Sequence, residues 1–148
     1  MQIKRILVPV DGSELSARAM HASVNLAGQL GAVIVGYVAP VSSSCEWSRI
    51  GRRSAEAAED DFDEVSVGSA RLVLAQFEAV ACAAGVTFES VLDEVRRIDK
   101  AILVTATRHR CDLIVMVALG RGAFGEFLFG SQTKAILADS RLPLLVLH

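Results

Sequence analysis

Five short apolar runs separated by longer amphipathic segments are the feature that most constrains the fold. Because consecutive positions are apolar in each run, each run predicts a strand buried on both faces, as in parallel sheets. A helix between consecutive strands allows the chain to return for parallel pairing. We therefore predict an α/β fold: a doubly wound, five-stranded parallel sheet with helices on both faces. The predicted strands are Ile6–Val10, Ala32–Val38, Val86–Leu92, Leu113–Ala118 and Leu142–Leu147.

Apolar residues recur at helical spacing between these runs. In the first intervening segment Leu15, Ala19 and Leu26 share one helical face. Gly31 and Gly85 follow two such segments and predict helix ends, whereas a glycine within a strand, as at Gly36, indicates close packing of backbone. The predicted helices are Glu14–Leu30, Ala55–Ala84, Asp99–Arg110 and a last helix that begins at Ser131.

The stretch from Pro40 to Ser54 has no apolar periodicity and is rich in serine, glycine and arginine. It predicts a long loop, which we expect to be the most mobile segment and a candidate lid. Arg49, Arg52 and Arg53 would reach a bound phosphate group if the loop closed, although loop charges are usually solvated. Elsewhere the 148 residues show no linker, so residues 1–148 are predicted to form a single domain.

Composition and charge exclude several classes of protein. A hydrophobic content of 52% excludes a disordered chain, and a net charge of −2 gives no positive field for nucleic acid or an anionic membrane. Pro9 and Asp11 interrupt the first apolar run too early for a signal peptide, and no later run reaches the ~18 residues of a membrane span. We therefore expect a cytoplasmic protein with no nucleic-acid and no membrane partner.

The reactive side chains do not form a recognisable catalytic or metal-binding pattern. The cysteines and histidines stand apart without ligand spacing, which argues against a disulfide framework and a metal site. No GxSxG, GxxxxGK[ST] or HExxH motif is present, so we predict no catalytic residues and at most slow, incidental hydrolysis. The residues concerned are Cys45, Cys82, Cys111, His21, His109 and His148.

Two turns lie where a doubly wound sheet binds ligands, at the carboxyl ends of strands next to the reversal of strand order. Asp11 follows the first strand; its carboxylate could accept hydrogen bonds from donor groups of a ligand, or it could form the turn before the helix. Gly130 and Ser131 begin the last helix, where free N–H groups attract phosphate, although a helix cap alone would explain the pair. The segment from Gly120 to Gly125 also fits GxGxxG, but the next strand lacks the acidic residue of a nicotinamide site.

The segments ILVPVDGS, LIVMVALGRGAFGEFLFGSQTKAIL and LPLLVL resemble the universal stress protein family over nearly the whole chain. The resemblance implies a Rossmann-like sheet in the order 3-2-1-4-5. Nucleotide-binding members carry a glycine, two residues, a second glycine, nine residues, a third glycine, and then serine or threonine. Gly120 and Gly130-Ser131 match the later elements, but Val117 occupies the first position.

The resemblance further implies a stress-response regulator that binds ATP, with Mg²⁺ accompanying the nucleotide. The β-branched Val117 either fills the space of the sugar or turns into the core, so we expect weak binding. The alternative is a stress-responsive dimer with a degenerate pocket that acts through protein contacts. The implied nucleotide-binding residues are Pro9, Val10, Asp11, Val38, Met116, Val117, Gly120, Arg121, Gly130, Ser131 and Gln132.

The last strand predicts a homodimer. Pro143 to Leu147 form an apolar strand at the end of the sheet, and an uncovered apolar edge favours pairing. Family members commonly pair this strand across a two-fold axis, and Pro143 need not donate to that ladder.

Overall fold

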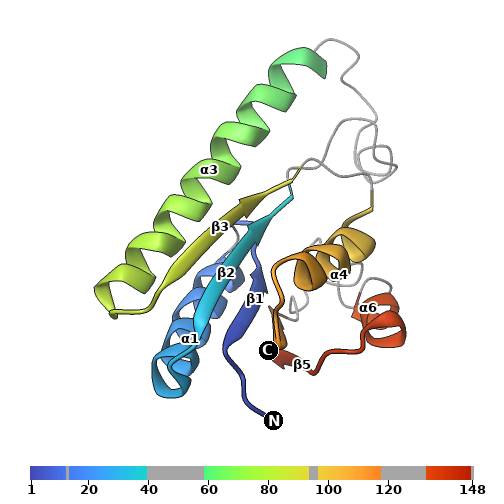
Figure 1. The fold of residues 1–148 in the computed structure, drawn as a ribbon. Helices are drawn as coiled ribbons and strands as arrows, with labels where there is room; N and C mark the ends of the chain where they lie inside the picture. Colours follow the sequence, from blue (N-terminus) through green and yellow to red (C-terminus); the bar gives the residue numbers. More distant parts are fainter. Residues whose placement is uncertain (13, 40–58, 94–96, 118–132, 148) are drawn as a thin grey trace.

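The computed structural model describes residues 1–12, 14–39, 59–93, 97–117 and 133–147. Strands and helices alternate along these ranges, as predicted (Figure 1). The elements are β1 (Arg5–Pro9), α1 (Glu14–Leu30), β2 (Val33–Val38), α3 (Glu59–Ala83), β3 (Phe88–Leu92), α4 (Ile98–Arg108), β4 (Leu113–Val117), α6 (Thr133–Asp139) and β5 (Leu144–Leu147).

The five strands form one parallel sheet in the order β3-β2-β1-β4-β5, which confirms the predicted fold and strand order. β1 lies at the centre, where Leu7 pairs with Val35 of β2 on one side and Ile114 of β4 on the other. The chain adds β2 and β3 on one side of β1 before it crosses to β4 and β5. The strand order therefore reverses between β1 and β4, which is the position where such sheets bind ligands.

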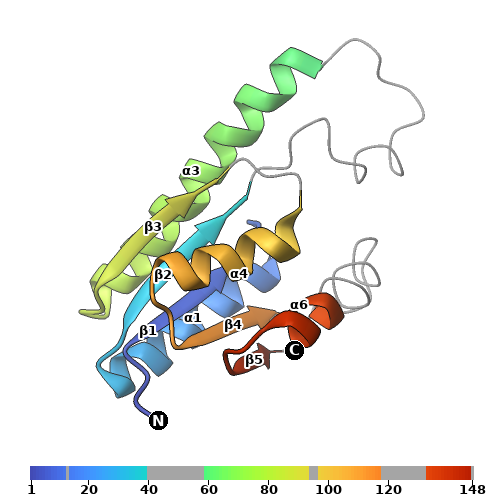
Figure 2. The same cartoon turned by 45° about the vertical axis from the view of Figure 1, so that its right-hand side comes forward.

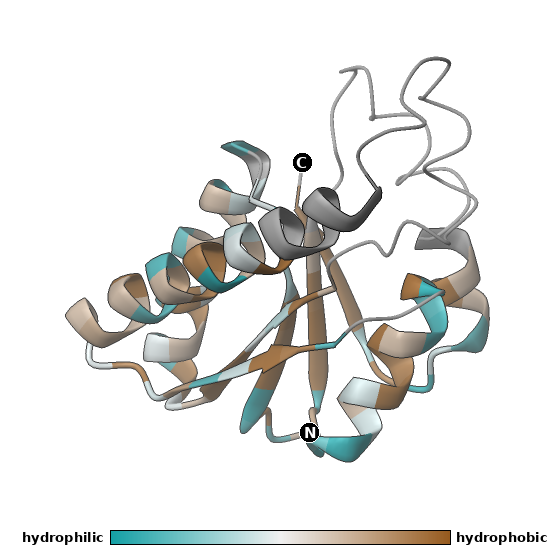
Figure 3. Ribbon diagram, turned by 90° about the horizontal axis from the view of Figure 1, so that it is seen from above, coloured by the Kyte–Doolittle hydropathy of each residue, from teal (hydrophilic) through white to brown (hydrophobic). Residues whose placement is uncertain are grey.

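Helices cover both faces of the sheet. α1 and α3 lie on one face, and α4 and α6 lie on the other (Figure 2). Seen from above, the apolar strands lie between the two helical layers (Figure 3). Residues of β1 alternate between the layers: Ile6 and Val8 pack towards α1 and α3, whereas Leu7 packs towards α4. This double burial explains the unbroken apolar run.

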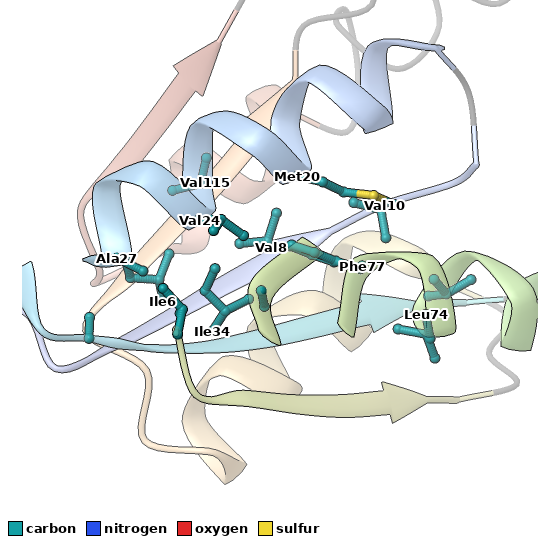
Figure 4. Close-up of a cluster of buried hydrophobic side chains, with 14 of the residues drawn as sticks. Ile6, Val8, Val10, Met20, Val24, Ala27, Ile34, Leu74, Phe77 and Val115 are labelled. Atoms are coloured by element: carbon teal, nitrogen blue, oxygen red, sulfur yellow. The ribbon is translucent and has the colours of Figure 1, made fainter. Parts of the chain in front are cut away.

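The core on the α1 side depends on a glycine in β2. Met20 and Val24 of α1 and Phe77 of α3 pack over the sheet (Figure 4). The rings of Phe77 and Phe88 contact each other at a centroid distance of 4.9 Å. A Cβ on Gly36 would lie 2.5 Å from the Phe88 ring and 3.0 Å from the Phe77 ring. Gly36 is therefore a point of close packing, as predicted, but phenylalanine side chains and not a second backbone approach it.

Three helices end at a residue with a left-handed backbone conformation. The N–H that follows this residue then bonds to a carbonyl in the last turn of the helix. After α3, Gly85 has φ +70°, and the Val86 N–H donates to the Ala81 carbonyl at 2.9 Å. Gly31 has φ +63° after α1, so both predicted glycine stops are confirmed. α4 ends at Arg108 rather than at the predicted Arg110, because Arg110 takes the left-handed position with φ +52°.

A charged cluster at the amino-terminal edge of the sheet links β1, β3 and the end of α4. The Arg5 guanidinium bonds to the Glu89 carboxylate, and its Nε donates to the His109 carbonyl at 2.6 Å. The other Glu89 oxygen contacts Nδ1 of His109. Arg5 thereby crosses β2 and joins elements that are distant in the sequence.

This cluster makes the stability of the protein depend on pH. Hydrogen bonding from Arg5 holds the pKa of Glu89 below its ordinary value of 4.5. The ionised Glu89 therefore stabilises the folded protein fully at pH values above 4.5. This stabilisation is lost as the pH falls through the lower pKa that Glu89 has in the folded state. We expect Glu89→Gln to lower the melting temperature near neutral pH, and the difference from wild type to narrow in acid. Melting curves between about pH 3 and 7 measure this.

Glu78→Gln is the matched control, since Glu78 is exposed on α3. It should leave the pH dependence unchanged. A melting difference for Glu89→Gln that stayed constant down to the lowest pH would contradict the role given to this carboxylate.

Candidate functional site

The end of β1 forms the centre of the candidate site at the reversal of strand order. Val10 is buried, and its N–H donates to the Tyr37 carbonyl of β2 at 2.9 Å. Pro9 is half-buried as the last residue of β1, and Asp11 is exposed. Of these three residues, Asp11 therefore presents a charged group to solvent at the carboxyl edge of the sheet.

Asp11 is held by a serine in the first turn of α1. Its N–H donates to Oγ of Ser16 at 2.8 Å, and the Ser16 hydroxyl donates to Oδ1 of Asp11 at 2.7 Å. Asp11 thus forms the turn before α1, which is one of the two roles considered for it. Because Asp11 is also exposed, its side chain can still contact a ligand. Ser16 was not identified from the sequence. The sequence signal was a serine about one helical turn after an Asp-Gly pair. This pattern is too common to identify a site.

Gly12 brings this loop against α3. It has φ +84°, a conformation that favours glycine, and a Cβ there would lie only 2.8 Å from Cγ2 of Val73. A larger residue at position 12 would be strained in its backbone and would also displace Val73. The loop after β1 is therefore fixed by both α1 and α3.

The end of β2 lies beside β1 at the same edge. The Val38 side chain is buried in the core, and its carbonyl accepts a hydrogen bond from the Asp93 N–H at 3.3 Å. The neighbouring Tyr37 hydroxyl is enclosed on the α4 face. Burial raises the pKa of Tyr37 to about 12, and the nearby Asp93 carboxylate adds to the rise, so the phenol stays neutral.

β4 contributes the remaining described residues of the candidate site. Met116 is buried among residues of the α4 face. The backbone of Val117, the last residue of β4, pairs with Leu147 of β5. The structure thus brings the ends of β1, β2 and β4 to one edge. Other predicted site residues lie outside the described residues: Gly120, Arg121, Gly130, Ser131 and Gln132, together with the loop Pro40–Ser54 and its arginines.

The described residues contain neither a metal-binding cluster nor a membrane-spanning helix. No group of three or more histidine, cysteine, aspartate or glutamate residues there could hold a metal ion. Cys82 is exposed and Cys111 is buried, and both are free thiols. None of the described helices combines the length and apolarity needed to cross a bilayer.

A doubly wound parallel sheet with a polar turn at the reversal of strand order is a Rossmann-like α/β fold, in which ligand sites lie outside the carboxyl ends of the strands. Residues 2–148 match the model of the universal stress protein family, so the chain belongs to that family. A curated relative from Thermus aquaticus, named "Universal stress protein in QAH/OAS sulfhydrylase 3'region", is 38% identical over 64 residues. That match covers 43% of this chain and 47% of the relative, so it spans about half the length of each.

Solved structures with the same fold include three universal stress proteins. The protein from Burkholderia pseudomallei is 22% identical with a TM-score of 0.76, covering 99% of this chain and 96% of that one. A universal stress protein in complex with cAMP is 21% identical with a TM-score of 0.68, and the match covers 100% of this chain and 99% of that one. One from Archaeoglobus fulgidus in complex with dAMP is 16% identical with a TM-score of 0.68, covering 100% of both chains. At these identities the likeness shows the fold.

Proposed function

We propose that this protein is a stress-response regulator that binds an adenine nucleotide, ATP, weakly at the carboxyl edge of β1 and β4. One observation carries the proposal: an exposed carboxylate, Asp11, is fixed in a glycine turn at the reversal of strand order. Family membership supports it, as do the cAMP and dAMP bound by two proteins of the same fold. Residues 1–148 act as one domain in this proposal, and the protein works in the cytoplasm.

The proposed contacts divide between the adenosine and the phosphates. Asp11 accepts hydrogen bonds from ribose hydroxyl or adenine amino groups, while the backbone at Pro9, Val10 and Val38 lines the pocket. Gly120, Gly130 and Ser131 approach the phosphates at the start of the last helix, with Arg121 and Gln132 beside them. Met116 and Val117 complete the wall at the end of β4.

Mg²⁺ would arrive with the nucleotide, held chiefly by its phosphates. This fits the described residues, among which no cluster of acidic side chains could hold a metal by itself. The Ser16 hydroxyl donates to the Asp11 carboxylate but is itself buried, so it is not placed to attack a ligand. Binding, with incidental hydrolysis at most, is therefore the proposed activity.

Calorimetry of the purified chain with ATP and Mg²⁺ tests the proposal. We expect saturable binding in the range between about micromolar and millimolar. Asp11→Asn should weaken it, because the amide replaces one acceptor oxygen with a donor. Asp139→Asn removes an exposed carboxylate on α6 and serves as the control, which should bind as wild type does. An absence of heat at millimolar ATP, with cAMP and AMP also silent, would contradict the proposal.

The second candidate is the stress-responsive dimer with a degenerate pocket, and an exposed leucine on β5 favours it. β5 is an edge strand, since its one neighbour in the sheet is β4. Leu145 on this strand is 38% exposed. An apolar residue on an open edge favours pairing with a second copy of the same strand.

We expect Leu145→Asp to give a monomer or insoluble protein, because a charge would be buried in the dimer interface. Leu72→Asp is the control, since Leu72 is 66% exposed on α3, and it should leave the dimer intact. Light scattering measures the mass. A monomer for the unmodified chain at micromolar concentration would rule out this interface.

A further inference from the structure

The hydrogen bond between Ser16 and Asp11 holds the exposed carboxylate of the candidate site. Ser16 is 4% exposed, whereas Asp11 is exposed. The serine hydroxyl accepts the Asp11 N–H at 2.8 Å and donates its own proton to Oδ1 at 2.7 Å. Both the backbone and the side chain of Asp11 are therefore tied to a single buried atom.

A second buried serine on α1 makes a different kind of hydrogen bond. Ser23 is 1% exposed, and its hydroxyl donates to the carbonyls of Ala19 and Met20 within the same helix. That is the usual way in which a buried serine in a helix satisfies its hydroxyl. Ser16 instead bonds out of the helix to the loop that ends β1.

The opposite side of the loop is fixed by packing. Gly12 is so close to α3 that a Cβ would lie 2.8 Å from Val73. The turn at residues 11–12 is therefore held between a hydrogen bond from α1 and a van der Waals contact from α3. A carboxylate held in this way loses little conformational freedom when a ligand binds, which favours affinity.

We infer that Ser16 is a positioning residue for nucleotide binding: it holds the Asp11 carboxylate in the orientation that accepts the ribose or adenine donor. The inference rests on the proposed function, because it assigns Asp11 to the nucleotide. Ser16 itself is buried, so it would act on the ligand by orienting Asp11 and not by direct contact. Removing its hydroxyl should leave the fold intact and take away the bonds that Ser16 makes to the Asp11 N–H and carboxylate.

A double-mutant cycle with AMP as the probe tests this role. Ser16→Ala should weaken AMP binding by about 3- to 10-fold, the effect of one hydrogen bond. Ser23→Ala, the matched control, should bind AMP as wild type does. In the Asp11→Ala background Ser16→Ala should have little further effect, because no side-chain oxygen is left at position 11 for the serine to hold. Ser16→Thr keeps the hydroxyl and should recover part of the affinity.

Amide hydrogen exchange of ligand-free protein provides a readout that does not need the nucleotide. The Asp11 N–H should exchange faster in Ser16→Ala than in wild type and remain unchanged in Ser23→Ala. Equal AMP affinity in Ser16→Ala and wild type, or an equal loss in both backgrounds, would overturn the inference while leaving the proposed function standing. A wild-type chain that bound no AMP, ATP or cAMP would overturn both. Unchanged exchange of the Asp11 amide would overturn the positioning role alone.

Discussion

Gly36→Ala is expected to destabilise the protein by about 1–3 kcal/mol, the usual cost of an overpacked core. The added Cβ would lie 2.5 Å from the Phe88 ring and 3.0 Å from the Phe77 ring. Phe77 is fully buried and cannot move aside without disturbing α3, so Phe88 must shift. Such a loss is a large share of the stability of an ordinary domain, which is roughly 5–15 kcal/mol. Denaturant unfolding measures it.

Gly28→Ala is the matched control for the same chemical change. A Cβ at Gly28 would lie 3.8 Å from Val86, an ordinary contact, and the residue is within α1. Alanine is favoured over glycine inside a helix, so this variant should be stabilised by up to about 1 kcal/mol. Equal effects of the two substitutions would show that the phenylalanine pair does not require glycine at position 36.

Val117→Gly is expected to tighten ATP binding by roughly one to two powers of ten. This corresponds to ~1–3 kcal/mol for the removal of a steric conflict or the recovery of a hydrogen bond beside the sugar. The variant restores the glycine that nucleotide-binding family members carry at this position. About 1 kcal/mol of fold stability should be lost, because glycine is more flexible in a strand.

Gly130→Val acts in the opposite direction and accompanies Val117→Gly in the same calorimetric series. A branched side chain at position 130, in the predicted phosphate loop, should close that loop and abolish binding. If neither variant changed the affinity, and no ATP binding were measurable in either, the pocket would be vestigial. The dimer acting through protein contacts would then be the better description.

Local pattern was sufficient to predict the strands and the two helical layers, whereas the strand order was predicted with the help of the family resemblance. The apolar runs of β1, β2 and β4 are buried on both faces, and double burial requires helices on both sides of the sheet. The edge strands β3 and β5 are only partly buried. The limits of the elements were less certain, because they depend on single hydrogen bonds. Val86 was assigned to a strand, yet its N–H closes the end of α3, and β3 begins only at Phe88.

Contacts between distant side chains were beyond sequence reasoning. Nothing near Arg5 in the sequence indicates that it reaches Glu89 across β2, since that pair depends on strand register. The same holds for the contact between Gly12 and Val73. The sequence could identify Asp11 as a residue that forms a turn or contacts a ligand. The bond to Ser16 was needed to show how its carboxylate is held.

The location of the nucleotide is the central claim, and an NMR titration of the labelled chain with ATP and Mg²⁺ tests it most directly. We predict that amide signals of Val10, Asp11 and Val38, at the carboxyl edge of the sheet, shift progressively with ATP. Signals of Arg5 and Glu89, at the amino-terminal edge, should stay in place. Shifts confined to that opposite edge, or no shifts at millimolar ATP, would contradict the account.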